Sequence, residues 1–537
     1  MSTFNESITH YFPNCRRALG APAWDRILSA LGTSDPREFV RGIGDAGRDA
    51  NITPWLADAV RVEWQYWQLS QTTQGAVETS EKRMVNPHLA LVPVSHGGLP
   101  QWLGYQDAED GTPPELSDGH VLIWRHPETG EWQCRDAEDD DLLALKLVVE
   151  ELDIREAARM SDSTPARFLA ALYQAMDRGL ILSPPSWVRR EFSEAESKDL
   201  PESLLSAPVF TLQWHITQSC DLRCRHCYDR SPRQEMPLDE GVRILEDFFA
   251  FTQSMHVRGH VTFTGGNPLL YPDFLPLYQY AADMGFSCAI LGNPADGAVL
   301  DAILEIQPLT HYQISLEGLE PYNDYIRGKG HFKRSLSFLD QLRAREIYAM
   351  VMLTLNRDNM DQVLALADVL RNRADGFTFN RLAMVGEGKQ LTVPKPEDFQ
   401  HFLAAYLAAS ADNPVMTLKD NLFNLVNQDC ERQFDGCTGY GCGAAFNFVS
   451  LLPDGEVHAC RKFPSLIGNV KAQSLAEIYQ DTPAAQYRRG PKECRGCDLA
   501  VSCRGCPAVV YGMGLDASVQ RDPFCFYAHA PSGHGVS

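Results

Sequence analysis

Strand and helix patterns alternate between residues 208 and 395. Short apolar runs of strand length occur at 210–217, 260–264, 286–292, 311–316, 348–355 and 376–382. Helical patterns separate them, for example over 238–251, 332–345 and 360–373. Six such repeats predict an α/β domain in which a parallel sheet with right-handed crossovers forms a full or partial (β/α)6 barrel. Active sites of such barrels lie at the carboxyl ends of the strands.

The chain before this barrel follows other patterns. Residues 1–80 are expected to be a helical N-terminal extension, for which a structural role is the simplest interpretation. In residues 81–195, the strand-like run 120–126, a turn at Gly130 and a second run at 131–134 predict a β-hairpin. Helical patterns at 141–152 and 164–178 follow the hairpin. Strands followed by short helices predict a winged-helix-like module, and Pro184-Pro185 begins a linker.

This module resembles the PqqD-like precursor-recognition element of peptide-modifying enzymes. Such elements bind a leader peptide by adding it as an extra strand at a sheet edge. A DNA-binding winged helix is the alternative, and the acidic run at residues 138–141 argues against it. After the barrel, residues 396–436 are expected to form a helical bridge. Residues 437–530 are rich in Cys, Gly and Pro, with too few strands for a core of their own, so inorganic groups are expected to hold them together.

Composition narrows the class of protein. The chain has 537 residues and a net charge of −22, which argues against a nucleic-acid partner. It has no run of eighteen apolar residues, so no membrane span is expected. The N-terminus has no apolar signal segment, so the expected location is the cytoplasm. In that reducing compartment, clustered cysteines indicate metal sites rather than disulfides.

Three of the fifteen cysteines directly follow the first barrel strand. Cys220, Cys224 and Cys227 have the spacing Cx3Cx2C, which places three thiolates on one short loop. Because Fe–S clusters are normally held by four cysteines, three predict a cuboidal cluster with one open iron, where a cofactor can coordinate. Zinc is the alternative, since His226 offers a fourth ligand.

The loop identifies the chain as similar to radical SAM enzymes. In that family the open iron binds S-adenosylmethionine (SAM), which is cleaved to a 5′-deoxyadenosyl radical. Gly265-Gly266-Asn267-Pro268 resembles the family's GGEP segment, with an amide where Glu is usual. Ser315 and Glu317 match its ribose-binding position, Arg327 its partner of the SAM carboxylate, and Arg381 is a candidate for the adenine pocket. The resemblance thus implies these SAM contacts: Tyr228, Gly265, Gly266, Asn267, Ser315, Glu317 and Arg327.

The C-terminal cysteines resemble the SPASM domain, which holds two auxiliary [4Fe–4S] clusters. That pattern implies Cys442, Cys460 and Cys506 for the first cluster, with Cys437 as the upstream fourth ligand. It implies Cys494, Cys497, Cys503 and Cys525 for the second cluster. Two residues stand between Cys503 and Cys506 where the family usually has three. Cys430 is left over, as an alternative ligand or a substrate-facing thiol, and a zinc ribbon over 494–506 is the alternative to the second cluster.

Together the resemblances imply a maturase for a ribosomally made peptide. It is expected to install a thioether, a carbon–carbon cross-link or a related oxidation, using SAM, three [4Fe–4S] clusters and a flavodoxin or ferredoxin as electron donor. A maturase of a folded protein is the second enzymatic hypothesis. Sulfatase maturases carry a catalytic Asp where this chain has Arg461, so formylglycine formation is not expected. A zinc-stabilised peptide-binding scaffold without chemistry is the hypothesis from another class, and the sequence names no catalytic side chain.

Overall fold

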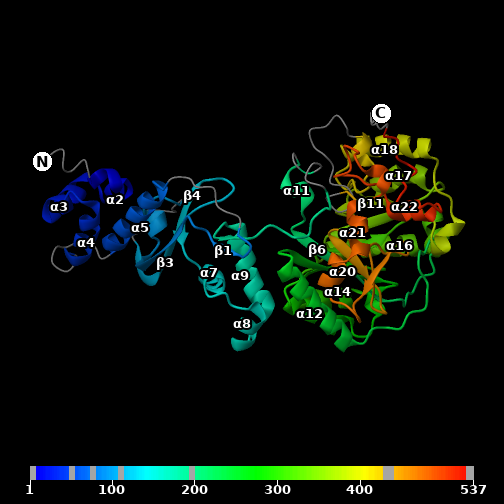
Figure 1. Cartoon of the computed structure of the whole chain (residues 1–537), viewed down its shortest axis with the longest axis horizontal. Coiled ribbons are helices and arrows are strands. Elements are labelled where there is room, and N and C mark those ends of the chain that lie inside the picture. Colours follow the sequence, from blue (N-terminus) through cyan, green and yellow to red (C-terminus); the bar gives the residue numbers. More distant parts are fainter. Residues whose placement is uncertain are drawn as a thin grey trace, which may run out of the picture. The chain divides into compact units, whose positions relative to one another are not determined.

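The computed structural model describes residues 8–46, 55–72, 80–106, 114–192, 197, 200–426 and 441–527. The chain divides into two compact units, unit 1 over residues 1–185 and unit 2 over residues 186–537, and each is described by itself (Figure 1). Among the described helices, none is both long and apolar enough to cross a membrane.

Unit 1 is built on an antiparallel sheet of order β2-β3-β4. Its strands are β2 (Leu89–Gly97), β3 (Glu115–Arg125) and β4 (Trp132–Asp136), so the expected hairpin around Gly130 is confirmed. Alternate side chains of β3 point to opposite faces, as a pleated strand requires. Val121 and Ile123 pack with Trp24 and Phe39 in one hydrophobic core. The helices on that side are α2 (Pro13–Leu19), α3 (Ala21–Leu31), α4 (Pro36–Ala46), α5 (Trp55–Ser70) and the short α6 (Leu99–Trp102).

Three helices complete unit 1: α7 (Asp139–Val149), α8 (Ile154–Met160) and α9 (Pro165–Asp177). The expected helices over 141–152 and 164–178 are therefore confirmed. The strands β1 (Met84–Val85) and β5 (Ile181–Leu182) pair antiparallel beside them. The acidic run at 138–141 starts α7, where negative charge suits the helix N-terminus. Asp141 accepts from the Glu138 backbone N–H at 2.8 Å and pairs with Arg135 at 2.7 Å.

Unit 2 contains the predicted parallel sheet. All six predicted strands are confirmed, and neighbours in sequence are neighbours in the sheet. This order is what right-handed β/α crossovers produce. The strands are β6 (Val209–Thr217), β7 (Arg258–Gly265), β8 (Ser287–Leu291), β9 (His311–Ser315), β10 (Ala349–Leu355) and β11 (Gly376–Arg381).

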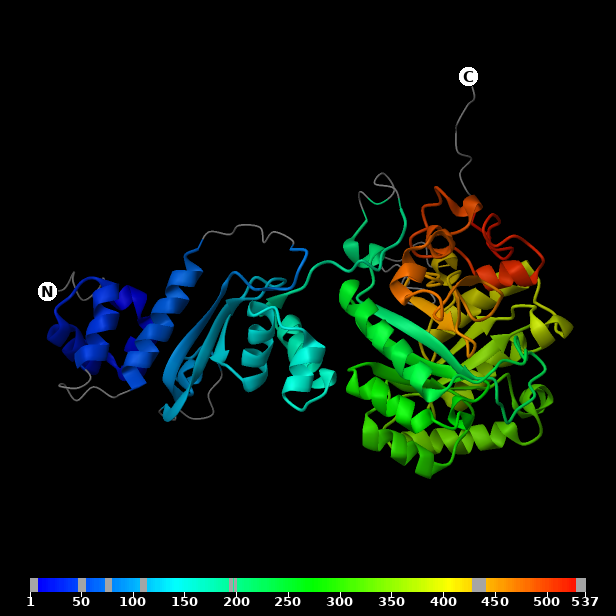
Figure 2. The ribbon, with the colours of Figure 1, turned by 60° about the horizontal axis from the view of Figure 1, so that its bottom comes forward.

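Helices between the strands cover the outside of this sheet (Figure 2). Their apolar faces bury large side chains such as Phe248 on α12 and Phe338 on α16. The helices between the strands are α12 (Leu238–Ser254), α13 (Phe274–Asp283), α14 (Gly297–Ile306), α15 (Glu320–Arg327), α16 (His331–Arg343) and α17 (Val363–Leu370). Helix α11 (Glu202–Leu205) precedes β6, and α18 (Pro396–Ser410) and α19 (Phe423–Val426) follow β11. Short 3-10 turns are η1 (Pro268–Leu270), η2 (Met360–Gln362), η3 (Gly386–Gln390) and η5 (Lys492–Cys494).

The C-terminal region extends the barrel sheet instead of forming a separate one. Strand β12 (Phe448–Leu451) pairs parallel with β6, and β13 (Glu456–His458) and β14 (Leu466–Asn469) follow antiparallel. The result is one sheet of nine strands that ends at β11 and β14. Helices α20 (Leu475–Gln480), α21 (Thr482–Arg489) and α22 (Pro507–Gly512) pack around it. The few strands of this region are thus stabilised by the barrel's own sheet.

Candidate active site

A cavity of about 450 Å³ lies at the C-terminal ends of the barrel strands in unit 2. Its wall includes residues from the end of β6, from the end of β7, and from β9, β10 and β11. The active site was predicted from the sequence at this end of the sheet. Most of the predicted SAM-site residues line it, namely Cys220, Cys224, Cys227, Tyr228, Gly265, Gly266, Ser315 and Arg327.

The cysteine loop presents its sulfur atoms to this cavity. The Asn293 side-chain amide lies 3.6 Å from Cys220 Sγ, and Arg327 Nη1 lies 3.7 Å from Cys224 Sγ. N–H donors to sulfur stabilise thiolates and tune the potential of Fe–S clusters. The backbone fixes the loop from both sides, since Arg225 N–H donates to the Ile326 carbonyl and Cys227 accepts from the Glu387 N–H at 2.8 Å. The donor set therefore fits a thiolate-bound cluster.

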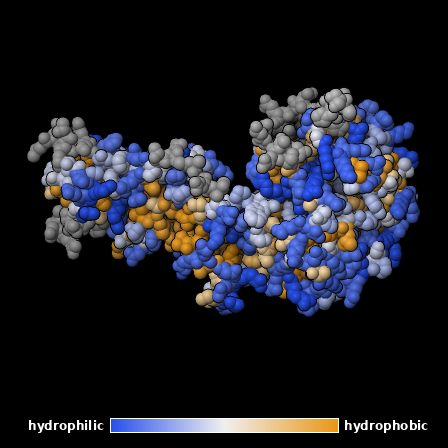
Figure 3. Space-filling model, in the orientation of Figure 1, coloured by the Kyte–Doolittle hydropathy of each residue, from blue (hydrophilic) through white to orange (hydrophobic). Residues whose placement is uncertain are grey.

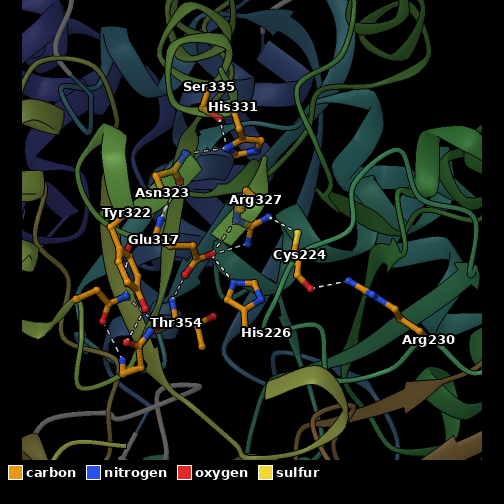
Figure 4. A network of polar contacts seen from close by, with 12 residues as sticks. Cys224, His226, Arg230, Glu317, Tyr322, Asn323, Arg327, His331, Ser335 and Thr354 are labelled. Carbon is orange, nitrogen blue, oxygen red and sulfur yellow. Dashed lines mark hydrogen bonds and ion pairs between the residues drawn. The ribbon is translucent and has the colours of Figure 1, made fainter. Parts of the chain in front are cut away.

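Glu317 lies behind this loop as the centre of a buried polar network (Figure 4). Its Oε1 accepts from Arg327 Nη2 at 2.6 Å and lies 2.8 Å from His226 Nε2, while Oε2 accepts from the Thr354 N–H at 2.8 Å. Burial acts to raise the pKa of this carboxyl, but His226 and Arg327 hold the pKa at about 2. Glu317 does not line the cavity, so its position differs from the predicted ribose contact. It orients Arg327 instead, and Ser315 alone of the predicted ribose pair faces the cavity.

The glycine segment allows the end of β7 to touch the start of the cysteine loop. A Cβ on Gly265, whose φ is 133°, would lie 2.2 Å from the Thr217 carbonyl oxygen. A Cβ on Gly266 would lie 2.2 Å from the Ser219 carbonyl oxygen. Only glycine permits this approach.

Asn267, which follows these glycines, is not among the residues that line the cavity. Its Nδ2 donates to Asp221 Oδ1 at 3.0 Å, and Asn293 Nδ2 donates to the same oxygen at 2.6 Å. The sequence predicted Asn267 as an acceptor for the SAM amino group. In the structure its Nδ2 donates to the carboxylate of Asp221, the residue after Cys220, and the role of its oxygen as an acceptor stays a prediction.

A second cavity brings four C-terminal cysteines together. Its wall contains the ligands predicted for the second auxiliary cluster: Cys494, Cys497, Cys503 and Cys525. Cys503 Sγ accepts from the Gly505 N–H at 3.4 Å, and burial raises the pKa of Cys494 to about 12. Cluster assembly there must displace the thiol protons.

Three of the four cysteines predicted as ligands of the first auxiliary cluster lie among the described residues. Cys460 and Cys506 pack against the same small hydrophobic cluster, and the Cys442 N–H donates to the Cys503 carbonyl at 3.2 Å. Cys437 and Cys430 lie outside the described residues. Across the described chain, no three His, Cys, Asp or Glu side chains converge as ligands of a single metal ion do. Cluster ligands lie farther apart than zinc ligands because each binds a different iron.

Arg381 lines the cavity at the end of β11, but two carboxylates hold its guanidinium. Its Nη1 and Nη2 donate to both oxygens of Asp522, at 2.8 and 2.7 Å, and its Nε donates to Asp420 at 2.7 Å. Asp522 Oδ2 also accepts from the Cys506 N–H at 2.8 Å. The candidate adenine contact is therefore primarily a link between the barrel rim and the cysteine loops.

The cavity wall also includes residues that the sequence did not assign to a site. His215 on β6 lies 3.3 Å from the Tyr228 hydroxyl, and Arg461 donates from Nη1 to Thr264 Oγ1 at 2.9 Å. Lys462 follows Arg461 into the wall. The sequence could have indicated Arg461 and Lys462, because they directly follow Cys460 and the neighbours of a predicted ligand lie near its cluster.

Two family models match unit 2: "Radical SAM superfamily" over residues 214–370 and "Iron-sulfur cluster-binding domain" (SPASM) over residues 442–507. The chain is 28% identical to mycofactocin maturase MftC of Mycobacterium ulcerans, over 60% of this chain and 88% of that protein. It is 22% identical to an AdoMet-dependent heme synthase of Methanosarcina barkeri, over 59% of this chain and 96% of that protein.

One solved structure carries the same fold over most of the chain. Streptococcus suis SuiB bound to precursor peptide SuiA is 17% identical, with a TM-score of 0.50, and covers 76% of this chain and 97% of that one. The two family models cover the cysteine loop, strands β6 to β10 and most of the C-terminal cysteines. This chain therefore carries a radical SAM domain over residues 214–370 and a C-terminal SPASM domain, an iron–sulfur cluster-binding domain, over residues 442–507.

Proposed function

We propose that this enzyme is a maturase that installs an oxidative modification, such as a thioether or a carbon–carbon cross-link, in a ribosomally made precursor peptide. The observation that carries the proposal is the composition of the cavity wall. The cysteine loop of the barrel forms one part of it, and Arg461 and Lys462 of the SPASM domain form another. A substrate in this cavity lies between the radical source and the auxiliary cysteines. The similarity to mycofactocin maturases supports a peptide as that substrate.

Cys220, Cys224 and Cys227 are the residues that hold the SAM cluster in this proposal. When bound, the cluster and SAM supply a 5′-deoxyadenosyl radical, which takes a hydrogen atom from the substrate. The protein's part is to position SAM and the substrate and to shield the radical from solvent. Ser315, on the cavity wall, is proposed to contact the SAM ribose, and Arg327 is oriented by Glu317 toward Cys224.

Together with the SAM cluster, two proposed auxiliary clusters give a total of three [4Fe–4S] clusters. Cys494, Cys497, Cys503 and Cys525 are proposed to hold one auxiliary cluster. Cys437, Cys442, Cys460 and Cys506 are proposed to hold the other. These eight cysteines would hold fully ligated clusters, which would supply an acceptor for the electron left when the substrate radical forms its new bond. A flavodoxin or ferredoxin is the proposed donor to the SAM cluster.

The leader of the precursor is proposed to bind unit 1 at the β4 edge of its sheet. Strands β2 and β4 are the two edges of that sheet. Strand β2 contains Pro93 and a register shift between Val94 and His96, and both features protect an edge from pairing. Strand β4 has neither, so its edge is the more suitable for strand addition. Hydrophobic residues gather over the strands of unit 1 on the face shown in Figure 3.

The test uses protein purified and reconstituted without oxygen. It is incubated with a reductant, SAM and each short peptide that is found to be encoded beside its gene. We expect roughly twelve irons per chain, 5′-deoxyadenosine formation, and a peptide product that has lost hydrogen. SAM cleavage with no change in the peptide, but with modification of a neighbouring enzyme, would instead support a maturase of folded proteins. Zinc without iron would contradict the radical mechanism.

A further inference from the structure

Arg461 and Lys462 bring positive charge from the SPASM domain into the cavity. Both side chains are half-buried and line the same wall. The hydrogen bond from Arg461 Nη1 to Thr264 Oγ1 fixes the guanidinium at the end of β7, directly before Gly265. Arg461 is therefore held at a definite place in the cavity.

The other arginines at the strand ends are neutralised by buried acids. Arg327 pairs with Glu317, whose side chain is fully buried, and Arg381 pairs with Asp420 and Asp522. Within the described parts of the chain, neither Arg461 nor Lys462 has a carboxylate at ion-pair distance.

Two further ionisable residues of the wall, Asp229 and His215, do not pair with Arg461 or Lys462, and Asp229 lies 3.8 Å from Arg233 instead. Asp229, an acid of the cavity wall, is held by Gln218 at 3.1 Å and by the Ser231 N–H at 2.8 Å. Burial, and then the charge of Arg461, lower the pKa of His215 well below its usual range, so this imidazole is neutral. The SPASM side of the cavity thus carries two cations without a carboxylate partner among the described residues. Burial raises the pKa of the nearby Cys506 thiol, and the charge of Lys462 also acts to lower it.

SAM would bring a single carboxylate, and the resemblance to radical SAM enzymes assigns it to Arg327, whose Nη1 lies 3.7 Å from Cys224 Sγ. Arg461 and Lys462 lie on the SPASM part of the wall. Two donors of this kind suit a carboxylate, because charge-assisted hydrogen bonds are the strong ones. A peptide offers that group as an Asp or Glu side chain or as its C-terminus.

We propose that Arg461 and Lys462 form a carboxylate-binding subsite for the substrate peptide, which places an acidic side chain or a C-terminal carboxylate in the cavity. The inference rests on the proposed function, since it names the chemical class of peptide that the maturase accepts. Arg461 supplies a planar, tethered donor, and Lys462 adds a second charge on a flexible stem.

The test measures binding of three short probes to the SAM-loaded holoenzyme by anaerobic equilibrium dialysis. They are acetyl-Gly-Glu-Gly-amide, its Gln analogue, and acetyl-Gly-Gly-Gly with a free C-terminus. We expect at least one charged probe to bind about tenfold more tightly than the Gln analogue. The probe that does so identifies the source of the carboxylate. Equal binding of all three probes overturns the proposal.

Charge variants assign the effect to the two residues. In Arg461→Gln and Lys462→Gln we expect the discrimination to fall to about twofold, whereas Arg461→Lys, which keeps the charge, retains most of it. Lys389→Gln removes an exposed charge outside the cavity and serves as the matched control. Unchanged discrimination in both neutral variants overturns the proposal.

Iron content and SAM affinity are measured on the same samples. If both neutral variants lose SAM or iron but keep probe discrimination, the cations serve the cofactors and the subsite is wrong. Failure of the wild type to modify any peptide, with probe discrimination intact, counts against the proposed function and not against the subsite.

Discussion

At the residue scale, Glu317 shows how a buried carboxylate acts through its neighbours. Arg327 and His226 share one of its oxygens, and the Thr354 N–H takes the other. Such an arrangement stabilises the charge of Glu317 and fixes the direction of Arg327 toward the cysteine loop. The function of Glu317 is therefore to position a residue of the site.

Glu317→Gln tests this positioning role. The change removes the charge that pairs with Arg327, whose side chain is only 10% exposed. Breaking a buried pair from one side costs about 3–5 kcal/mol, so we expect the thermal midpoint of unit 2 to fall and SAM to bind several-fold more weakly. Glu320→Gln, which removes an exposed partner of Lys333, is the control and should change stability by less than about 1 kcal/mol. Equal losses in both variants would contradict the prediction.

His331 lies at the outer end of the same network and predicts a pH dependence. Burial, followed by the charges of Arg327 and Arg334, lowers the pKa of His331 to about 4. Between that pKa and the ordinary value of 6.5, the unfolded chain binds a proton that the folded chain does not. Stability from this group is complete above the ordinary pKa and is lost as the pH falls toward 4.

His331→Gln should therefore flatten the pH profile. We expect the thermal midpoint of the variant to fall less between about pH 7 and pH 5 than that of the wild type. Some slope remains, because the pKa values of His260 and His311 are also lowered to about 4. Parallel profiles for the two proteins would show that His331 does not carry the effect. Circular dichroism during anaerobic heating provides the measurement.

At the element scale, local pattern predicted the strands but not where every side chain points. The six parallel strands could be predicted because each is a short apolar run bounded by polar residues, and that property is local. The contacts of Arg381 could not, because its partner Asp522 is 141 residues away along the chain. Asn267 and Glu317 were predicted as SAM contacts from their positions in the motifs. The orientation of the Asn267 side chain depends on Asp221, and that of Glu317 depends on Arg327. The joining of β12 to β6 was missed for the same reason.

The loop that carries Asp522 links two predicted cluster sites. Its side chain accepts from the Cys506 N–H, and its carbonyl accepts from the Cys525 N–H at 2.9 Å. Arg381 anchors this loop to the end of β11, and the side chains of Arg381 and Asp522 are both 3% exposed or less. One residue therefore fixes a ligand of each auxiliary set against the barrel.

Asp522→Asn should loosen both cysteine loops. We expect a lower thermal midpoint and a loss of about four irons per chain, the content of one cluster. Asp301→Asn, which breaks an exposed pair with Arg345, is the control and should keep its iron. Iron analysis and the low-temperature paramagnetic resonance spectrum of the reduced protein measure the effect. A full iron complement with an unaltered spectrum would show that the pair is not needed to hold the loops.

At the scale of the whole molecule, the proposed function assigns a separate task to each unit. Unit 1 has its own core, which contains Trp24, Phe39, Val121 and Ile123. Unit 2 contains the described cysteines of the Cx3Cx2C loop and of the SPASM domain. The residues that line the SAM cavity all belong to unit 2. Radical formation is therefore expected to need unit 2 alone, and recognition of the leader to need unit 1.

A chain that begins at Ser186 tests this division. We expect it to assemble its clusters and to cleave SAM in the absence of peptide at the rate of the full chain. Turnover of the precursor at low peptide concentration should fall at least tenfold, because the leader no longer raises the local concentration of the core peptide. Removing the leader from the precursor should lower its turnover by the full chain by the same factor. With the shortened chain, removing the leader should cause no further loss of turnover. Equal turnover of both precursors by the full chain would mean that unit 1 does not bind the leader.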